Sequence, residues 1–241
     1  MFDKLIGIKK GVSVSRKSMP RHIAVSLNGC IRWAKENKSE LDASYKKGFQ
    51  AVSNLISAQT SMDIPILTVH LLSEQMRTSV HYDAFAKLLA RYLAELSNSE
   101  LISTRQVKVS VLGKWYDLPG DVVEQIKKIL DSTRDYDRFF LNLCINYDGQ
   151  EEIMDGCRLI LRKALSEKLD PASLDRSVIK DNLYSSYYPP PSLLVVTGGV
   201  KHTSGLLLWD SGYSHIYFSD VLWPDFSKGA LLEAIASFQK K

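Results

Sequence analysis

Polar residues able to do chemistry follow the first apolar run, at Asn28 and Cys30, and recur late in the chain, at His202 and His215. An amide, a thiol and two imidazoles can hydrogen bond, and a thiolate or an imidazole can act as nucleophile or base. The five histidines and three cysteines show no zinc-binding spacing. Leu27-Asn28-Gly29-Cys30 is not a dinucleotide fingerprint, and neither a P-loop nor a G-x-S-x-G turn occurs. Generic motifs therefore identify no reaction.

The composition is typical of a globular protein. The chain has 241 residues, 45% hydrophobic and 24% charged, and 31 basic against 27 acidic residues give a net charge of +4. This length allows one large domain or two small ones, and the composition excludes intrinsic disorder. Three cysteines are too few for a disulfide framework, so we expect free thiols. No apolar run of about 18 residues occurs, so we expect no membrane-spanning helix.

Residues 1–19 form a basic N-terminal segment with a single acidic residue, Asp3. The segment lacks the apolar stretch and the cleavage site of a signal peptide, so we expect a cytoplasmic protein. The mild positive charge is compatible with peripheral contact with an anionic membrane. The lysine pairs Lys9-Lys10 and Lys46-Lys47 are not interleaved with aromatic residues, so we expect no nucleic-acid partner.

Short apolar runs alternate with longer helical patterns along the chain. The apolar runs predict strands at residues 22–27, 65–70, 107–112, 139–145, 192–196 and 215–218. Apolar residues at intervals of three and four predict helices at residues 38–62, 82–97, about 118–132, 151–164 and 226–238. Residues 169–191 contain three consecutive prolines and predict a long surface loop. This alternation favours an α/β fold with a mostly parallel central sheet flanked by helices.

Three stretches resemble the cis-prenyltransferases, also called undecaprenyl diphosphate synthases. Residues 20–34 (PRHIAVSLNGCIRWA) are similar to the family's P-x-H-[VI]-A-x-x-M-D-G-N-x-R-W-A. Residues 146–153 (NYDGQEEI) are similar to N-Y-G-G-R-x-[DE]-I. Residues 197–226 contain Thr-Gly-Gly, Leu-Leu-Trp, a tyrosine and Y-F-S-D-V-L-W-P-D-F in the family's order and spacing. The resemblance covers about residues 20–239, so we expect one cis-prenyltransferase-like domain at residues 20–241.

The resemblance implies a hydrophobic tunnel for an isoprenoid chain, a prenyl diphosphate or other isoprenoid ligand, and a homodimer or heterodimer. It retains four of the family's substrate-binding residues, Gly29, Arg32, Trp33 and Ser204. Residues 72–79 match the family stretch F-S-x-E-N-W-x-R, whose final arginine is a serine here, so Arg77 is expected to substitute for it.

The resemblance also implies a divergent site that lacks most of the family's charged residues. The family's metal-binding aspartate corresponds to Asn28, and the asparagine two residues later corresponds to Cys30. The two arginines that clamp isopentenyl diphosphate correspond to Val196 and His202, and a metal-contacting glutamate corresponds to His215. The arginine and the histidine of the next helix are Leu41 and Tyr45.

Condensation brings two diphosphates into one cleft, and their charges must be neutralised. Loss of two arginine contacts alone removes several kcal/mol of charge-assisted phosphate binding. We therefore expect neither a classical magnesium site nor magnesium-dependent condensation with isopentenyl diphosphate.

Three functions remain open. The first is a non-catalytic subunit that pairs with an intact homologue, although the chain lacks the R-x-G ending of many such subunits. The second is a repurposed isoprenoid enzyme, a terpene cyclase or a non-canonical coupling enzyme, in which Asn28, Cys30, His202 and His215 would supply polar chemistry. The third is an isoprenoid carrier whose tunnel is lined by the stripe Tyr82, Phe85, Leu89 and Tyr92, a spacing that is also typical of ordinary core. The aromatic residues in 207–226 favour association through that segment.

Overall fold

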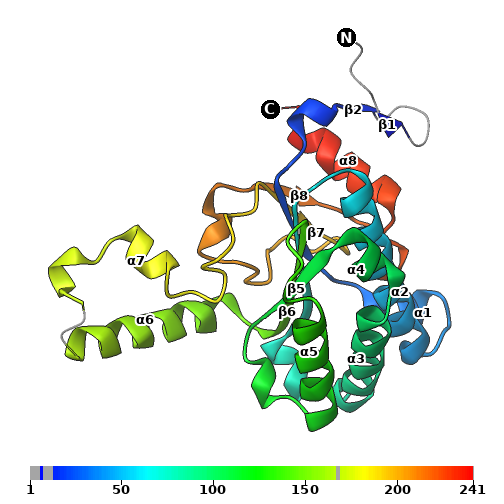
Figure 1. The fold of residues 1–241 in the computed structure, drawn as a ribbon. Helices are drawn as coiled ribbons and strands as arrows, with labels where there is room; N and C mark the ends of the chain where they lie inside the picture. The colour runs from blue at the N-terminus through cyan, green and yellow to red at the C-terminus, as the bar shows by residue number, and fades with distance from the viewer. Residues whose placement is uncertain (1–5, 8–12, 167–168, 241) are drawn as a thin grey trace.

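A parallel sheet runs through the centre of the molecule (Figure 1). The structure is a computed structural model that describes residues 6–7, 13–166 and 169–240. The order of the described strands is β5-β6-β4-β3-β7-β8, and each neighbouring pair is parallel. The strands are β3 (His22–Ser26), β4 (Ile66–Ser73), β5 (Val107–Leu112), β6 (Phe139–Tyr147), β7 (Leu193–Val196) and β8 (His215–Phe218). The predicted α/β fold with a parallel sheet is confirmed.

Helices cover the sheet and connect its strands. Figure 1 shows α6 and α7 extending away from the layer that contains α2, α3 and α5. The helices are α1 (Cys30–Glu36), α2 (Leu41–Ser61), α3 (Tyr82–Ser97), α4 (Glu100–Arg105), α5 (Gly120–Ser132), α6 (Gly149–Leu165), α7 (Arg176–Lys180) and α8 (Lys228–Phe238). A separate antiparallel pair joins β1 (Ile6–Gly7) to β2 (Ser13–Val14).

The two faces of the sheet have different surroundings because strand side chains alternate between faces. Ile23 and Val25 of β3, with Leu67 and Val69 of β4, belong to the large apolar core that also contains the buried sides of α2, α3, α5 and α8. On the opposite face, alternate residues such as Ala24 belong to a smaller core completed by residues 206–207. The main apolar core therefore lies on the side of the long helices.

The segment 169–191 differs from the predicted surface loop. It contains the short helix α7, and its end is anchored to the sheet by buried side chains. Leu183 and Tyr188 are buried, and the Tyr188 hydroxyl lies 2.6 Å from the Ser110 hydroxyl of β5. The composition of the segment did not reveal these anchors, because each partner is distant in sequence.

The N-terminal segment is described only in part. Lys4, Lys9 and Lys10 of the predicted basic segment lie outside the described residues. Ser15 is linked to α8, because its backbone N–H donates to the Gln239 side chain at 2.8 Å and its carbonyl accepts from that side chain at 2.7 Å. The boundary at residue 19 stays a prediction.

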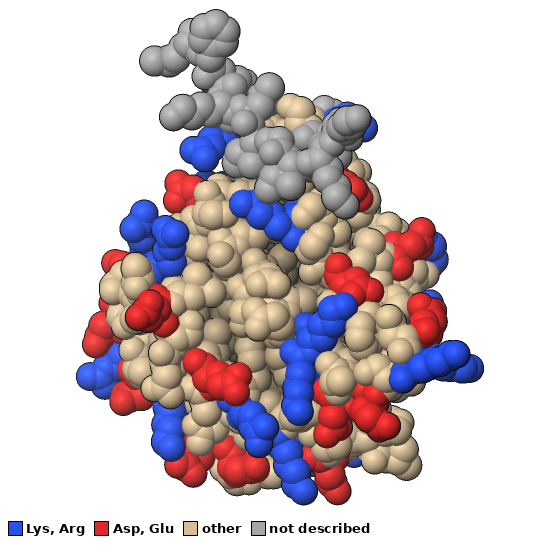
Figure 2. Space-filling view, turned by 90° about the vertical axis from the view of Figure 1, so that its right-hand side faces the viewer, with Lys and Arg blue, Asp and Glu red and all other residues tan. Residues whose placement is uncertain are grey.

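The surface seen in Figure 2 mixes positive and negative side chains without a broad region of one sign. Within the described ranges, no helix combines the length and the hydropathy needed to cross a membrane. The cytoplasmic location and the absence of a nucleic-acid partner stay predictions.

Candidate functional site

A cavity of about 830 Å³ opens at the carboxyl ends of β3 and β4. Ligands of open parallel sheets commonly bind at this edge, and the volume is that of a typical small-molecule site. The cavity is bounded by α1, α2, α3, the 3₁₀ turn η2 (Glu74–Thr78) and the loop at 198–208. It is the best-formed candidate site among the described residues.

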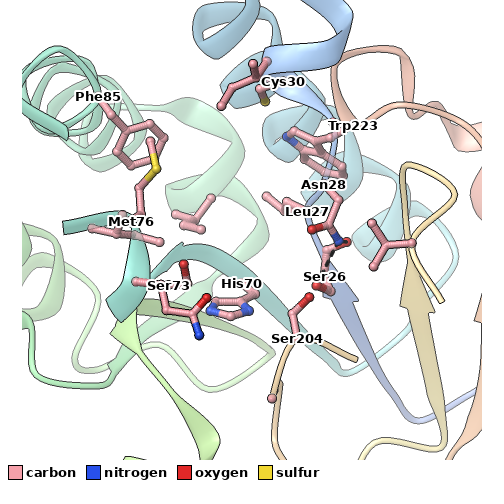
Figure 3. Close-up of a pocket in the computed structure, with 18 of the residues that line it drawn as sticks. Ser26, Leu27, Asn28, Cys30, His70, Ser73, Met76, Phe85, Ser204 and Trp223 are labelled. Atoms are coloured by element: carbon pink, nitrogen blue, oxygen red, sulfur yellow. Dashed lines mark hydrogen bonds between the residues drawn. The ribbon is translucent and has the colours of Figure 1, made fainter. Parts of the chain in front are cut away.

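The cavity has a polar end and an apolar end (Figure 3). Ser26, His70, Ser73 and Ser204 gather at the polar end, whereas Phe85 lies toward the opposite end. Ser26 and His70 are paired positions on adjacent strands, so their side chains leave the same face of the sheet. An amphiphilic ligand would fit this division.

Aromatic side chains close the apolar end. Tyr45 and Phe49 of α2 line the cavity with Phe85 of α3, and the rings of Tyr45 and Phe85 meet edge to face at 5.0 Å between centroids. Beyond them Phe49 stacks on Tyr92, with ring centroids 4.7 Å apart. Of the predicted stripe, Phe85 lines the cavity, while Leu89 and Tyr92 are buried core residues.

Asn28 is fixed in the polar wall by hydrogen bonds of its side chain and its backbone. Its side-chain amide donates to the carbonyl of Ser26 at 3.4 Å and to the Ser26 hydroxyl at 3.3 Å. Its backbone N–H donates to the Thr197 hydroxyl at 2.8 Å, and its carbonyl accepts from the backbone N–H of Trp223 at 2.9 Å. The turn after β3 is thus held against β7 and the C-terminal segment.

Gly29 and Cys30 connect that turn to α1. Gly29 has φ of +111°, and a Cβ there would approach the Leu222 side chain to 2.8 Å, so the turn requires glycine. Burial raises the pKa of the Cys30 thiol to about 11, with a smaller opposing effect from the Ser44 hydroxyl. Cys30 is therefore a thiol near neutral pH and a weak nucleophile.

Arg32 is the cationic residue of the cavity lining. Its guanidinium donates to the Gly198 carbonyl, which ties α1 to the loop after β7. Gly198 has φ of +75°, and a Cβ there would lie 2.7 Å from the Asn28 carbonyl oxygen. The backbone of the loop after β7 therefore packs directly against the Asn28 turn at the polar end of the cavity.

His202 and Ser204 enter the cavity from the loop after β7. The backbone N–H of Ser204 donates to Nδ1 of His202 at 3.2 Å. Because an N–H can only donate, this His202 nitrogen is an acceptor in the observed geometry. The structure thus brings together Asn28, Gly29, Cys30, Arg32, His202 and Ser204 of the predicted site.

Three predicted site residues lie elsewhere. His215 begins β8, away from the strand ends that form the cavity, and its Nε2 lies 3.1 Å from the Ser237 hydroxyl. Trp33 donates through Nε1 to Asp225 at 2.8 Å, with the Lys47 ammonium 4.4 Å from its ring centroid. Arg77 is directed toward the Asp117 carbonyl at 3.4 Å. The structure does not place His215, Trp33 and Arg77 in the cavity lining, because similarity of motifs does not fix the orientation of side chains, and their roles stay predictions.

Sequence reasoning did not identify His70 as a site residue. Its side chain is buried and lines the cavity, and burial lowers the pKa of its imidazole to about 4. The signal was its place near the end of a predicted parallel strand, where ligands usually bind. Tyr45 was noted only as a substitution, yet its buried hydroxyl has no partner among the described residues, and burial raises its pKa to about 12.

The donor set of the cavity does not suit magnesium, which prefers several carboxylate or phosphate oxygens. Among the residues that the structure describes, no three histidine, cysteine or acidic side chains are arranged to hold a metal ion. Asp148 supplies the carboxylate of the lining, and its Oδ1 accepts from the backbone N–H groups of Gln150 and Glu151 at the start of α6. Asn28 contributes an amide to the same lining.

A model of the family described as "Putative undecaprenyl diphosphate synthase" matches residues 27–241. The chain belongs to the cis-prenyltransferase family. The chain is 32% identical to the tritrans,polycis-undecaprenyl-diphosphate synthase (geranylgeranyl-diphosphate specific) of Thermoplasma acidophilum, over 95% of this chain and 89% of that one. It is also 32% identical to an isoprenyl transferase of Prochlorococcus marinus, over 97% and 88% of the two chains.

Solved structures support the same fold for this chain. Lavandulyl diphosphate synthase from Lavandula x intermedia, in complex with dimethylallyl diphosphate, superposes with a TM-score of 0.87. The two chains are 24% identical, and the match covers 93% of this chain and 97% of that one. At this identity the likeness concerns the fold.

Proposed function

We propose that this member of the family binds an isoprenoid in the cavity but does not itself condense isopentenyl diphosphate, and that it acts as a non-catalytic subunit. One observation carries this proposal: the formal charges of the cavity lining are one guanidinium, Arg32, and one carboxylate, Asp148. The apolar end formed by Phe49 and Phe85 suits an isoprenoid tail. The charges of two diphosphates would have no comparable set of partners.

The positions around the polar end support this proposal. Val196, at the end of β7, is fully buried and supplies no donor from its side chain. His202 offers an imidazole with one nitrogen already used by Ser204. The guanidinium of Arg32 donates one of its five N–H groups to the Gly198 carbonyl, so this one cation has only its remaining donors for a phosphate.

We further propose that the exposed side of β8 pairs with a second chain of the same family, as a homodimer or with an intact homologue. β8 is an edge strand, and Ile216 and Phe218 on it are 38% and 36% exposed. Trp209 and Tyr213 of the preceding segment are 36% and 94% exposed. Trp223, in contrast, is buried and stacks on Phe226 within the subunit, so we leave it out of the proposed pairing surface. Exposed aromatic side chains on and beside an edge strand of the described sheet suit such pairing.

Product analysis with labelled isopentenyl diphosphate tests the catalytic proposal. The protein is incubated with farnesyl or geranyl diphosphate and magnesium, alone and with an intact homologue such as the Thermoplasma enzyme, which also serves as the positive control. We expect no elongated product from the protein alone and a changed yield or chain length in the mixture. Elongation by the isolated protein would overturn the proposal, and an unchanged mixture would exclude the subunit role.

A second candidate, a repurposed isoprenoid enzyme, is favoured by one observation, the uncharged imidazole of His70 beside the cavity. An imidazole can accept a proton from a reacting isoprenoid. The same incubation with a single prenyl diphosphate would reveal this activity as a cyclised hydrocarbon or an alcohol.

A further inference from the structure

The hydrogen bond between His70 and Tyr147 fixes which nitrogen of the imidazole carries the proton. Nε2 of His70 lies 3.3 Å from the carbonyl oxygen of Tyr147. A carbonyl can only accept, so Nε2 must donate and Nδ1 must hold a lone pair in the uncharged ring. The edge-to-face contact with the Tyr147 ring, at 5.6 Å between centroids, supports the same ring orientation.

The lone pair of Nδ1 borders the cavity. Nδ1 has no hydrogen-bond partner among the described residues, and it is not one of the fully enclosed polar atoms that lack a partner. His70 is 6% exposed and lines the cavity, so this remaining exposure is to the cavity itself. Figure 3 shows its ring at the polar end. A buried acceptor of this kind requires a donor from a ligand or from water.

Ser26 supplies the complementary group. The Ser26 hydroxyl oxygen accepts from the amide of Asn28 at 3.3 Å, which leaves the hydroxyl hydrogen to donate. Ser26 lines the cavity and pairs in register with His70 on the adjacent strand. One donor and one acceptor therefore face the cavity from neighbouring strands.

We propose that the ligand of this cavity is an uncharged isoprenoid alcohol, whose hydroxyl donates to Nδ1 of His70 and accepts from the hydroxyl of Ser26. The isoprenoid tail then lies toward Phe85. This inference rests on the proposed function for the presence of an isoprenoid and adds the nature of its polar end.

A diphosphate meets these groups poorly. Its oxygens are acceptors near neutral pH, so they bring no proton to the lone pair of Nδ1, and two acceptors facing each other repel. Asp148, the carboxylate that most strongly influences the His70 imidazole, adds a like charge at the same end. Among the described lining residues Arg32 is the one cation that opposes these effects, and one of its N–H groups is used by the Gly198 carbonyl.

Binding titrations with three ligands of one chain length test the inference. Farnesol can donate and accept, farnesyl methyl ether can only accept, and farnesyl diphosphate is anionic. We expect the wild-type protein to bind farnesol about tenfold more tightly than the methyl ether, the usual magnitude for one buried hydrogen bond left unmade. We expect farnesyl diphosphate, with or without magnesium, to bind more weakly than farnesol.

Substituting His70 assigns the preference to its imidazole. In His70→Phe the ratio of the alcohol and ether dissociation constants should fall to about one, because the acceptor is gone while the ring volume is kept. His81→Phe, outside the cavity lining, should keep the wild-type ratio. Should His70→Phe fail to fold, the three wild-type titrations still decide the question.

The outcomes separate this inference from the proposed function. Tighter binding of farnesyl diphosphate, or equal binding of alcohol and ether by the wild type, would overturn the alcohol assignment without affecting the absence of condensation. If His70→Phe still bound farnesol more tightly than the methyl ether, that result would also overturn the alcohol assignment. Elongation in the product assay would instead overturn the proposed function, whichever ligand binds more tightly.

Discussion

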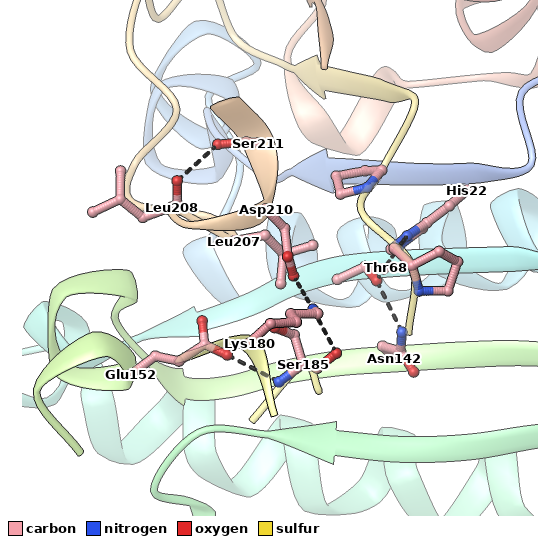
Figure 4. Close-up of polar contacts among 12 residues, drawn as sticks. His22, Thr68, Asn142, Glu152, Lys180, Ser185, Leu207, Leu208, Asp210 and Ser211 are labelled. Atoms are coloured by element: carbon pink, nitrogen blue, oxygen red, sulfur yellow. Dashed lines mark hydrogen bonds and ion pairs between the residues drawn. The ribbon is translucent and has the colours of Figure 1, made fainter. Parts of the chain in front are cut away.

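His22, at the start of β3, donates through Nδ1 to the carbonyl of Pro189, 2.7 Å away and 167 residues later in the chain. Its Nε2 accepts from the Thr68 hydroxyl at 2.8 Å, and that hydroxyl oxygen accepts from the Asn142 amide at 3.1 Å (Figure 4). In this direction of the hydrogen bonds the imidazole is uncharged, which is the form that its burial favours. It fixes the proline-rich segment against the sheet.

This arrangement predicts that acid destabilises the protein through His22. Burial is the main cause that lowers its pKa from 6.5 to about 4. The unfolded chain therefore binds more protons between these values, so the stabilisation is complete above about pH 6.5 and is lost as the pH falls toward 4. The loss is on the order of 3 kcal/mol. Urea unfolding from pH 7 to pH 4.5 should show it.

His22→Asn separates this effect from other titrations, because its amide can donate to Pro189 and has no proton to gain. We expect lower stability at pH 7 and a shallower decrease toward pH 4.5 than in the wild type. A variant whose decrease is as steep as that of the wild type would assign the acid sensitivity to another group.

The periodicity of apolar residues predicted helices and strands well where one face of the element is buried. The helix at 82–97 and the strand at 107–112 have the predicted bounds, because their apolar periods are strong. The helix α1 was missed as an element, since Ala34 is its one buried residue and a single buried position makes no stripe.

Predicted residues of two motifs meet at the candidate site, one motif after β3 and one after β7, where His202 and Ser204 lie. Asn28 and Cys30 follow a strand whose end borders the cavity, so their placement could be anticipated. His215 could not, because β8 presents its opposite end to the cavity, and motif similarity does not show which end of a strand a residue occupies. The role of His70 depends on a bond to Tyr147, 77 residues away.

Lys180 and Asp210 form a partly buried ion pair at 2.5 Å, with side chains 19% and 3% exposed (Figure 4). Lys180→Met would leave the carboxylate of Asp210 without its cation, and we expect a loss of about 3 kcal/mol of unfolding free energy. The control is Lys128→Met, which removes an exposed pair with Glu124 and should cost less than about 1 kcal/mol. Chemical denaturation measures both, and equal losses would contradict the argument.

The three cysteines should differ in their rates of alkylation. Cys157 is exposed on α6, whereas burial raises the pKa of Cys30 to about 11 and that of Cys144 well above its usual range. Since the thiolate is the reactive form, Cys157 should react first with iodoacetamide at pH 7.5, Cys30 slowly and Cys144 last. Peptide mass spectrometry gives the order. A bound isoprenoid should slow Cys30 but not Cys157, and rapid labelling of Cys30 would show that its thiol is activated.

The last prediction concerns the length of the ligand. Phe85 contributes to the apolar wall and contacts Tyr45 and Phe49, so Phe85→Ala should extend the cavity toward the interior. We expect the ratio of affinities for a twenty-carbon over a ten-carbon isoprenoid alcohol to rise several-fold, because the longer tail fills the new space.

Loss of a buried phenyl ring also costs about 3 to 5 kcal/mol of stability, so lower stability must be separated from a changed cavity. Phe139→Ala is the matched control, since Phe139 is 2% exposed in the same core but does not line the cavity. It should lose similar stability and keep the wild-type affinity ratio. If both variants shift the ratio equally, general loosening explains the change and Phe85 does not set the depth of the cavity. If only Phe85→Ala shifts it, the aromatic wall limits the length of the isoprenoid that this protein holds.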